Sequence, residues 1–491
     1  MHAVAWLETK SMGPGKIDRS DQVMKLELRD YQRRWCRKTW DAFEHGVDGQ
    51  RFTRVLSTAA TGAGKTICAS ALIYAAQRKG RRALFLADTD ELCDQALDKI
   101  HKSTGLIPSL EKANNRASRR ADVVVGSIQT MAQERRLATW SPEHFGLVIA
   151  DEAHTSMSDT YQRVLKHFNR DGAGAWTLGI TATPERSDDR NLWTFYEHLG
   201  DEIGLFELID RQHLAPITVQ TLPIHIDATK AKVRAVYADE GNDMADAIEP
   251  YWDQIIEEFK RHAGDRPTLF FHPGINASKR FTARLREAGV NAEHVDGTSK
   301  DRQDILRRYA AGEIQCLNNA QLLTKGYDCP RISCVCILRP TKSRVAYQQM
   351  VGRGTRLSPE TGKKDLLLLD LWWEFAERMQ PVGPADLLAK DKRHAREIAE
   401  KLREEGAHNM QDTARDLEAE REARLIARLK DLAKKRRAMR FDAREMGTLL
   451  ALPEVTDYTP QSDWERQPAT ERQKTTLVRA GVKVAGVKTK G

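Results

Sequence analysis

The sequence predicts an α/β protein with two tandem domains, each built on a parallel sheet, followed by a helical and basic C-terminal extension. Short apolar runs rich in Val, Ile and Leu alternate with helix-like stretches in two successive sets. Such runs are typical of parallel strands that helices cover on both faces. The composition changes after Asp370, and Ala, Leu, Glu, Lys and Arg dominate from about Asp386 onward.

Each apolar run is interpreted as one strand. In the first domain the predicted strands are residues 54–57, 83–86, 123–125, 147–150 and 177–180. In the second domain they are residues 268–271, 291–295, 314–317, 334–338 and 366–369. We place the first domain at residues 23–211 and the second at 247–375. Residues 1–22 form an N-terminal leader, 212–246 a connecting segment without a clear pattern of its own, and 376–491 the extension.

The composition favours a soluble globular protein. Of the 491 residues, 40% are hydrophobic and 30% are charged. No apolar run approaches the ~18 residues of a membrane-spanning helix, and the N-terminus lacks the apolar core of a signal peptide. We therefore expect a cytoplasmic protein without a membrane partner. None of the seven cysteines belongs to a Cys-x₂-Cys pair, so we expect no zinc site. Cys334 and Cys336 belong to an apolar strand and are expected to be small buried side chains.

The charge balance leans toward a polyanionic partner, because Lys and Arg exceed Asp and Glu by eight. Residues 421–440 alone hold nine Lys or Arg and two Asp or Glu, around a leucine-rich stripe at helical spacing. Two interpretations of this basic helix stay open. It contacts nucleic-acid phosphates, or it is the solvated side of a helix that packs on the preceding domains. The candidate phosphate contacts are Lys434, Lys435, Arg436 and Arg437.

A glycine-rich segment lies between the first predicted strand and a helix. It reads Ala59-Ala60-Thr61-Gly62-Ala63-Gly64-Lys65-Thr66. Glycines let backbone N–H groups approach phosphate oxygens, Lys65 can reach the β- and γ-phosphates, and Thr66 can ligate Mg²⁺. We expect the segment from Thr61 to Thr66 to bind ATP. The strict pattern has glycine at Ala59, so by that pattern alone the match is incomplete.

Two adjacent carboxylates follow the buried strand 147–150. Asp151 is expected to hold Mg²⁺, and Glu152 to orient and deprotonate the attacking water. An acidic pair at the end of a strand can also be a solvated loop. Combined with the glycine-rich segment, however, the pair predicts an ATP-hydrolysing site of the P-loop type.

These segments, with others up to Arg356, resemble the ordered motifs of superfamily 2 helicases. The box Asp151-Glu152-Ala153-His154 is similar to the DEAH-type signature, and the phosphate loop of this family commonly begins with alanine. The adenine-recognising element resembles Leu28-Arg29-Asp30-Tyr31-Gln32, and the element that couples ATP to nucleic-acid movement resembles Thr181-Ala182-Thr183-Pro184. The second-domain motif that touches ATP and strand resembles Thr324-Lys325-Gly326-Tyr327-Asp328. The last motif, Gln-x-x-Gly-Arg-x-x-Arg, is similar to Gln349-Met350-Val351-Gly352-Arg353-Gly354-Thr355-Arg356.

The resemblance implies two RecA-like domains that use ATP and Mg²⁺. Gln32, Gly326 and Asp328 are then expected to contact the nucleotide. Gln349, Arg353 and Arg356 are expected to act in catalysis from the second domain. A positioned arginine that stabilises charge on the γ-phosphate accelerates hydrolysis roughly 10³–10⁵-fold. These arginines reach the phosphate only if the two domains close on ATP, so hydrolysis becomes opening and closing.

The resemblance also implies contacts with the nucleic-acid backbone. Thr89, Ser127, Gln129 and Thr130 in the first domain and Thr324 in the second stand where helicases hold the strand. Asp88 departs from this expectation, because a carboxylate is a poor neighbour for a phosphate.

Details of the motifs are similar to the branch of DNA helicases that includes restriction-enzyme motor subunits. The resemblance therefore implies an ATP-dependent helicase or translocase that acts on DNA, in DNA repair or in a phage or restriction system. Two alternatives stay open. One is an RNA helicase on the same motor. The other is a nucleotide-gated DNA-binding scaffold that serves a partner protein, which the C-terminal extension could contact.

Overall fold

The computed structural model describes residues 27–182, 192–229, 242–320, 323, 327–375, 381–388, 392–404, 406–434, 468–471 and 473–475. The chain divides into two compact units. The first contains Met1–Pro216 and Ile224–Pro381, and the second contains Ile217–Pro223 and Val382–Gly491. The first unit carries two α/β domains, and the C-terminal extension belongs to the second.

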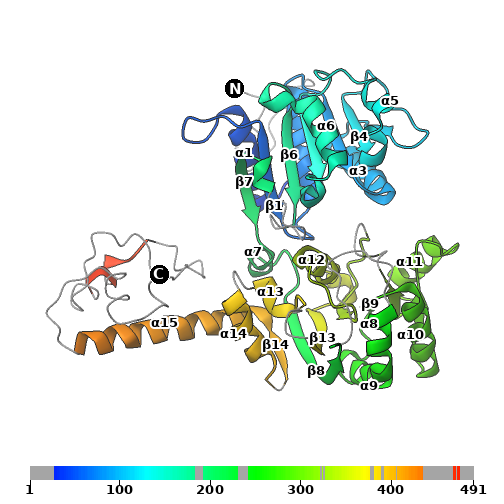
Figure 1. Cartoon of the computed structure of the whole chain (residues 1–491), viewed down its shortest axis with the longest axis vertical. Coiled ribbons are helices and arrows are strands. Elements are labelled where there is room, and N and C mark those ends of the chain that lie inside the picture. Colours follow the sequence, from blue (N-terminus) through cyan, green and yellow to red (C-terminus); the bar gives the residue numbers. More distant parts are fainter. Residues whose placement is uncertain are drawn as a thin grey trace. The chain divides into compact units, whose positions relative to one another are not determined.

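The first domain is built on a parallel sheet (Figure 1). Among the described residues the strand order is β3-β4-β2-β5-β6-β1-β7. The strands are β1 (Arg54–Ala59), β2 (Ala83–Ala87), β3 (Ser109–Glu111), β4 (Val123–Ser127), β5 (Leu147–Asp151), β6 (Trp176–Thr181) and β7 (His198–Ile203). All five strands predicted for this domain are present, and β3 and β7 add one edge strand on each side.

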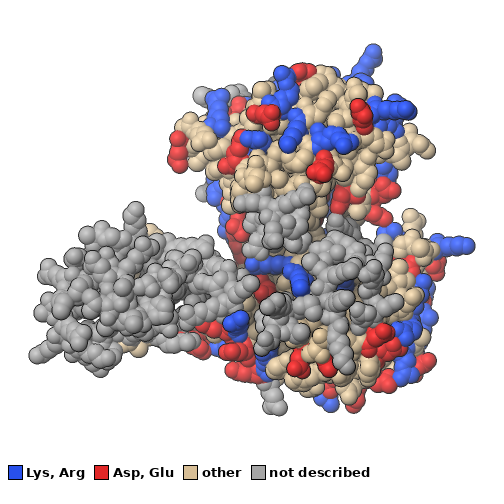
Figure 2. All heavy atoms as spheres, in the orientation of Figure 1, with Lys and Arg blue, Asp and Glu red and all other residues tan. Residues whose placement is uncertain are grey.

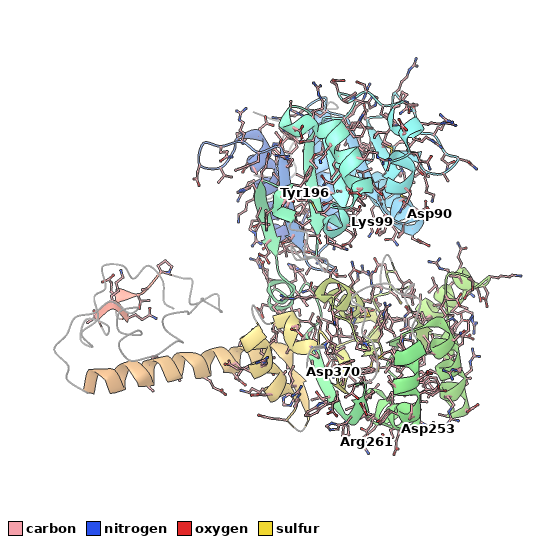
Figure 3. The ribbon with its side chains drawn as sticks, viewed as in Figure 1. Asp90, Lys99, Tyr196, Asp253, Arg261 and Asp370 are labelled. Carbon is pink, nitrogen blue, oxygen red and sulfur yellow. The ribbon has the colours of Figure 1, made fainter. Side chains whose placement is uncertain are left out.

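Helices cover both faces of this sheet, as its apolar runs require. Helices α1 (Asp30–Glu44), α2 (Lys65–Arg78) and α3 (Asp90–Thr104) pack together on one face. The other face packs against α4 (Ile128–Met131), α5 (Glu134–Leu137) and α6 (Asp159–Asn169). Alternate strand residues such as Leu84, Val124 and Val148 enter this second core, because successive side chains point to opposite faces. Tyr196 (Figure 3) packs onto Gly179 of β6, where a side chain would collide with the tyrosine ring.

The second sheet has the strand order β10-β11-β9-β12-β13-β8-β14 among the described residues. Its strands are β8 (Ile217–Asp227), β9 (Thr268–Phe271), β10 (Ala292–His294), β11 (Cys316–Asn319), β12 (Cys334–Ile337), β13 (Leu366–Glu374) and β14 (Ala407–Asn409). Neighbours from β10 to β13 pair in parallel, and β14 pairs antiparallel with β8. All five predicted strands are present. Strand β8 arises inside the segment interpreted as a connection, and the domain boundaries themselves stay a prediction.

The helices of the second domain pack through aromatic side chains. They are α8 (Asn242–Ile248), α9 (Trp252–Ala263), α10 (Ile275–Glu287), α11 (Arg302–Ala311) and α12 (Arg344–Gly352), and α7 (Leu205–Asp210) precedes the domain. The ring of Trp252 in α9 meets that of Phe281 in α10 at 5.6 Å, and Phe259 meets Phe270 of β9 at 5.2 Å. The described 3₁₀ turns are Ala153–Thr155, Arg170–Gly172, Leu192–Thr194, Glu249–Tyr251 and Pro359–Thr361.

The described part of the second unit is mainly helical, as the sequence predicts. It contains α13 (Pro384–Leu388), α14 (Lys392–Leu402) and α15 (Met410–Lys434). Thr221 Oγ1 donates a hydrogen bond to the Leu402 carbonyl at 3.0 Å, and Lys401 pairs with Glu420 at 2.9 Å. The candidate phosphate contacts Lys435, Arg436 and Arg437 lie outside the described residues.

All seven cysteines are buried and free, and the prediction that Cys334 and Cys336 are buried is confirmed. None of the described helices combines the length and the apolar character needed to cross a membrane.

Candidate nucleotide and nucleic-acid sites

The glycine-rich loop joins β1 to α2, the arrangement that the sequence predicts. Strand β1 ends at Ala59 and α2 begins at Lys65, after Gly64 with a φ of +83°. A Cβ at Gly64 would lie 2.5 Å from Gln32 Nε2, and one at Gly62 would lie 2.9 Å from the Leu214 side chain. Glycine is therefore required at both positions, and the loop keeps its backbone N–H groups accessible to an anion at the start of a helix.

Gln32 lies against the loop rather than apart from it. Its Nε2 donates to the Ala63 carbonyl at 3.0 Å, and its Oε1 accepts from the Arg29 N–H at 3.0 Å. The Tyr31 hydroxyl donates to the same Ala63 carbonyl at 3.2 Å. Through these bonds, the start of α1 and the phosphate loop form one unit. Recognition of adenine by Gln32 stays a prediction.

Asp151 and Glu152 emerge from the end of β5 beside the loop. Glu152 adopts a left-handed backbone with a φ of 50°, which is uncommon for a residue with a side chain. Its Oε1 lies 3.7 Å from Lys65 Nζ, and the two side chains are 12% and 14% exposed. Thr155 Oγ1 donates to the Glu152 carbonyl at 2.9 Å and helps to hold this turn. The structure thus brings together two catalytic candidates that are far apart in the sequence.

The carboxyl group of Asp151 is buried in a way that suits a cation. Burial and, to a smaller extent, the neighbouring Glu152 carboxylate raise its pKa to about 7, although Lys65 acts in the opposite direction. A divalent cation would favour the ionised form, since a positive charge nearby stabilises a carboxylate. Asp151 and the Thr66 hydroxyl at the start of α2 offer the oxygen donors that Mg²⁺ prefers. The residues present therefore fit Mg²⁺ with a nucleotide phosphate.

His154 belongs to the site, although no role was predicted for this residue. Its Nδ1 lies 3.3 Å from Glu152 Oε2 and 3.4 Å from Thr181 Oγ1. It therefore joins the end of β5 to the end of β6, where Thr181 begins the predicted coupling element. The box itself contained His154, but its contact with Thr181 depends on the sheet. Thr183 and Pro184 lie outside the described residues.

In the second domain, the predicted catalytic arginines are held by the motif that precedes α12. Arg353 Nη1 donates to the Tyr327 carbonyl at 2.8 Å, and Arg356 forms an ion pair with Asp328. Burial lowers the pKa of Arg353, as does the charge of Arg356, whereas Glu152 and Asp328 act in the opposite direction. Gln349 is buried, and its Nε2 has no hydrogen-bond partner among the described residues. Thr324 and Gly326 lie outside those residues.

Within the first compact unit, the end of α12 lies beside the phosphate loop. A Cβ at Gly352 would lie 2.5 Å from Thr61 Cβ, so this position has room only for glycine. The Ala215 N–H donates to the Thr355 carbonyl at 2.6 Å. The last motif therefore lies close to residues predicted to bind ATP.

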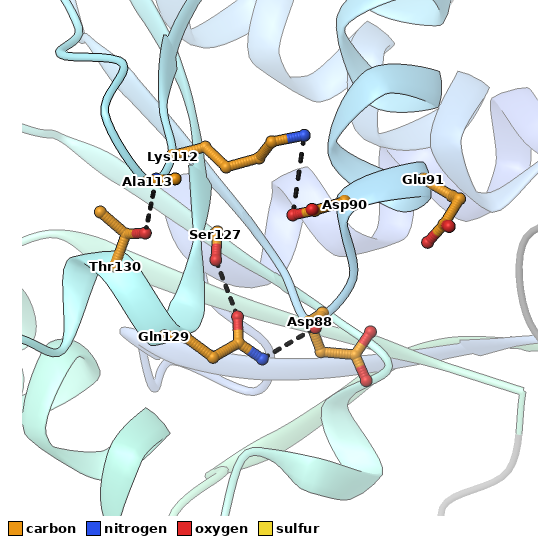
Figure 4. A pocket seen from close by; sticks show the side chains of 8 residues that line it. All are labelled: Asp88, Asp90, Glu91, Lys112, Ala113, Ser127, Gln129 and Thr130. Carbon is orange, nitrogen blue, oxygen red and sulfur yellow. Dashed lines mark hydrogen bonds and ion pairs between the residues drawn. The ribbon is translucent and has the colours of Figure 1, made fainter. Parts of the chain in front are cut away.

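Three of the predicted nucleic-acid contacts line one hollow of about 440 Å³ at the carboxyl ends of β2, β3 and β4 (Figure 4). The lining side chains are Asp88, Asp90, Glu91, Lys112, Ala113, Ser127, Gln129 and Thr130. Thr89 instead caps α3, with its Oγ1 accepting from the Leu92 N–H at 3.3 Å.

The polar groups of this hollow already bond to one another. Ser127 Oγ donates to Gln129 Oε1 at 2.7 Å, and Gln129 Nε2 donates to the Asp88 carbonyl at 2.8 Å. Three carboxylates and one lysine line the hollow, so its charge is negative. On the face in Figure 2, acidic and basic side chains are interspersed over the first domain. Phosphate contacts in the hollow therefore stay a prediction. Asp90 and Glu91 add to the unfavourable negative charge of Asp88.

Comparison with known protein families gives two matches. The family described as "Type III restriction enzyme, res subunit" matches residues 25–186. The family described as "Helicase conserved C-terminal domain" matches residues 251–358. The first match contains the phosphate loop and the acidic pair, and the second contains the arginine motif.

Curated relatives match the same part of the chain. The Saccharomyces cerevisiae protein named "Putative ATP-dependent helicase IRC3" is 30% identical over 356 residues, which cover 67% of this chain and 49% of the relative. The EcoAI type I restriction enzyme endonuclease subunit of Escherichia coli is 24% identical over 385 residues, covering 70% and 46%. The chain spans about half the length of these two relatives.

Solved structures share the fold. A fragment of a "putative HsdR subunit of a type I restriction enzyme" from Vibrio vulnificus has a TM-score of 0.53 at 22% identity, over 71% of this chain and 65% of the fragment. The type ISP restriction-modification enzyme LlaBIII has a TM-score of 0.55 at 19% identity, over 76% of this chain and 29% of the enzyme. The two sheets are thus tandem RecA-like domains, and the chain belongs to the superfamily 2 helicases and translocases, in the group related to restriction-enzyme motor subunits.

Proposed function

We propose that this chain hydrolyses ATP and uses the reaction to move on DNA. The observation that carries the proposal is the approach of Lys65 Nζ to Glu152 Oε1, 3.7 Å apart, beside a loop that requires glycine. A lysine in such a loop binds the β- and γ-phosphates, and a carboxylate next to it can accept the proton of the attacking water. Phosphoryl transfer to water is the chemistry that these groups serve best.

Each residue of the first domain has a distinct role in this proposal. Thr66 and Asp151 would hold Mg²⁺, which when bound neutralises phosphate charge. Lys65 orients the phosphates, and Glu152 orients the water and accepts its proton. His154 fixes the Glu152 carboxylate from the other side, at 3.3 Å from Oε2. Its second contact, to Thr181, gives the state of the ATP site a route to the coupling element.

The second domain supplies positive charge. Arg353 and Arg356 would stabilise the charge that builds on the γ-phosphate, and Gln349 would align the reacting groups. Gln349 lies in α12 and the two arginines follow this helix, whose end lies beside Thr61. ATP would favour the conformation in which both domains contribute, and hydrolysis would release it. Such a cycle converts chemistry into movement along a strand.

DNA is the substrate that the relatives favour. The EcoAI subunit belongs to a restriction enzyme, and the LlaBIII structure is that of an enzyme bound to DNA. Contacts of Ser127, Gln129 and Thr130 with the backbone would not read bases. Carboxylates in the same hollow would make this contact weak in the first domain, so other basic surfaces must contribute to affinity.

The test is ATP turnover with and without polynucleotide. Turnover should rise when single-stranded or duplex DNA is added, and DNA should stimulate at least as well as RNA. Strand displacement on forked DNA, run beside triplex displacement, separates a helicase from a translocase. Turnover indifferent to every nucleic acid would contradict the motor and favour a nucleotide-gated scaffold. Stronger stimulation by RNA would instead favour an RNA helicase.

The basic C-terminal segment is proposed as a second contact with DNA, resting on its charge of nine Lys or Arg against two Asp or Glu. Neutralising Lys434, Lys435, Arg436 and Arg437 together should reduce the slope of log affinity against log salt by up to about 3–4 units, because each phosphate contact contributes roughly 0.9. An unchanged slope with a lower melting temperature would assign the segment a structural role.

A further inference from the structure

Lys363 lies just after a tight turn that follows the arginine motif. The turn is the 3₁₀ segment Pro359–Thr361, which ends at Gly362 with a φ of +69°. The Thr361 and Gly362 N–H groups bond back to the Ser358 and Pro359 carbonyls at 3.1 and 3.0 Å. This reversal brings Lys363 back to the residues that precede the turn.

The ammonium of Lys363 bonds three backbone carbonyls from two separate segments. Nζ donates to the Gly354 carbonyl at 2.6 Å and to the Arg356 carbonyl at 2.6 Å, both within the arginine motif. It also donates to the Pro330 carbonyl at 3.1 Å, two residues after Asp328. An ammonium has three N–H donors, so these three acceptors satisfy it completely.

The two segments that Lys363 joins also carry an ion pair. Arg356 pairs with Asp328, and Arg353 donates to the Tyr327 carbonyl at 2.8 Å. Lys363 holds the backbone of Arg356 at one end of this arrangement and the backbone beside Asp328 at the other. The direction of the Arg356 guanidinium therefore depends on a lysine that lies outside the motif.

The surroundings of Lys363 make the charged form of its side chain unfavourable. Its side chain is half-buried, and burial, together with the charges of Arg356 and Arg266, lowers its pKa to about 7. Asp365 and Cys329 act in the opposite direction, although Asp365 is itself paired with Arg266 at 2.6 Å. A cation in such a position requires acceptors that favour the charged form, and the three carbonyls supply them.

We propose that Lys363 is a positioning residue for Arg356, fixing the arginine motif to the Asp328–Pro330 segment so that the guanidinium is placed for catalysis. The inference rests on the proposed role of Arg356 in ATP hydrolysis. Lys363 has no contact with the reacting atoms in this scheme and acts only through the backbone it holds. Catalytic geometry is sensitive to such support, because a misplacement of 1 Å can reduce the rate about 100-fold.

The test is a double-mutant cycle in the full chain, with DNA-stimulated ATP turnover as the first readout. Lys363→Met should lower kcat about 10- to 100-fold with KM changed less than about threefold. In the Arg356→Ala background the same change should cost less than about twofold, since residues that act as a unit are not additive. Lys364→Met is the matched control, because Lys364 is the exposed neighbour of Lys363, and it should match the wild type.

A second readout does not depend on activity. Amide hydrogen exchange should be faster in residues 327–330 and 353–357 of Lys363→Met than in those of Lys364→Met, because the bonds that restrain these backbones are lost. Exchange in β12 and β13 should be unchanged. Lys363→Arg keeps a cationic donor and should recover most of the lost kcat.

The outcomes distinguish the inferred role of Lys363 from the proposed role of Arg356. A kcat within about twofold of the wild type in folded Lys363→Met would overturn the inference, as would equal losses in both backgrounds. Normal turnover in Arg356→Ala would instead contradict the proposed role of the arginine. If Lys363→Met does not fold, Lys363→Gln takes its place in the cycle. Failure of both to fold would make Lys363 a structural brace and would also overturn the inference.

Discussion

The two sheet domains have the same arrangement of strands at their centres and different chemistry at their edges. Strands β3-β4-β2-β5-β6 and β10-β11-β9-β12-β13 occupy matching positions, and all neighbours in both series are parallel. At the end of β5 stand the carboxylates Asp151 and Glu152. The matching strand β12 is followed by Arg339 and by α12, which leads to Arg353 and Arg356.

In the proposed mechanism, this difference divides phosphoryl transfer between two copies of one architecture. The carboxylate edge can hold a metal and activate water, and the arginine edge can stabilise the charge that develops. We therefore expect the rate to depend on the approach of the two edges. The charged side chains at the two edges are also held by different kinds of contact. Lys65 pairs with Glu152 across the first, whereas on the second backbone carbonyls hold Arg353 and Lys363 and a carboxylate holds Arg356.

The largest expected effect is the removal of the arginine charge. Arg356→Ala should lower turnover by about 10³-fold or more and nucleotide affinity by less than about tenfold, because the arginine acts mainly on the transition state. The measurement is kcat beside the equilibrium binding of a fluorescent ATP analogue. Arg307→Ala, an exposed arginine on α11, is the control. Equal losses of affinity and rate would assign Arg356 to ground-state phosphate binding and weaken the division between the edges.

On the opposite edge, Glu152→Gln should lower turnover by about 10²–10⁴-fold while ATP binding is retained, since the amide keeps the shape but cannot accept a proton. Glu143→Gln is a control on the same domain, where the carboxylate is 65% exposed. The check is single-turnover hydrolysis with pre-bound ATP. Near-normal hydrolysis in Glu152→Gln would show that another group activates the water.

A smaller effect should follow from a methyl group at Gly64. Gly64→Ala should reduce nucleotide affinity about tenfold, because Cβ would displace Gln32 and a left-handed backbone costs roughly 1–2 kcal/mol for alanine. Gly80→Ala separates the two causes, since Gly80 has a φ of +71° but open space around its Cβ. Binding titrations and melting curves of both variants give the comparison. If both variants lose affinity equally, the contact with Gln32 has no role in nucleotide binding.

The last effect is on folding stability and not on turnover, and it concerns a buried histidine at the end of β9. Burial lowers the pKa of His272 to about 4, while its bond to Asn318 opposes the shift and His294 adds to it. The unfolded chain takes up this proton near pH 6.5, so stability is present above pH 6.5 and is lost as the pH falls toward 4. The loss is about 3 kcal/mol for one group. His272→Phe should show a shallower acid dependence of unfolding than the wild type. An acid dependence unchanged in His272→Phe would contradict the shift.

The strands that the sequence predicts are those buried on both faces, because only these read as unbroken apolar runs. Strand β8 was missed since its second half alternates between buried and exposed residues and contains Pro223. Strand β7 was missed because His198, Asp201 and Glu202 dilute its apolar signal at the edge of the sheet. In both cases the partner strands, rather than local preference, determine the structure.

The residues of the candidate site also divide into those that the sequence could predict and those that it could not. Lys65, Asp151 and Glu152 could be predicted, since each follows a strand in a pattern whose chemistry is local. The two hydrogen bonds of Gln32 could not, because Ala63 lies 31 residues away and its carbonyl has no sequence signature. Lys363 was missed for the same reason, with its Pro330 acceptor 33 residues distant. Backbone acceptors can be supplied by any residue type, so only the fold reveals them.

The burial of every cysteine has a practical consequence for fluorescence measurements of domain motion. Burial raises the pKa of the thiols of Cys36, Cys93, Cys316, Cys334 and Cys336. Maleimide dyes react with the thiolate, so these native thiols should label slowly. The native chain should therefore take up little dye. One new cysteine can be placed at exposed Arg135 and one at exposed Arg307 for labelling. Energy transfer between dyes at these two positions would follow the approach of the domains in single molecules, with all seven native cysteines left in place.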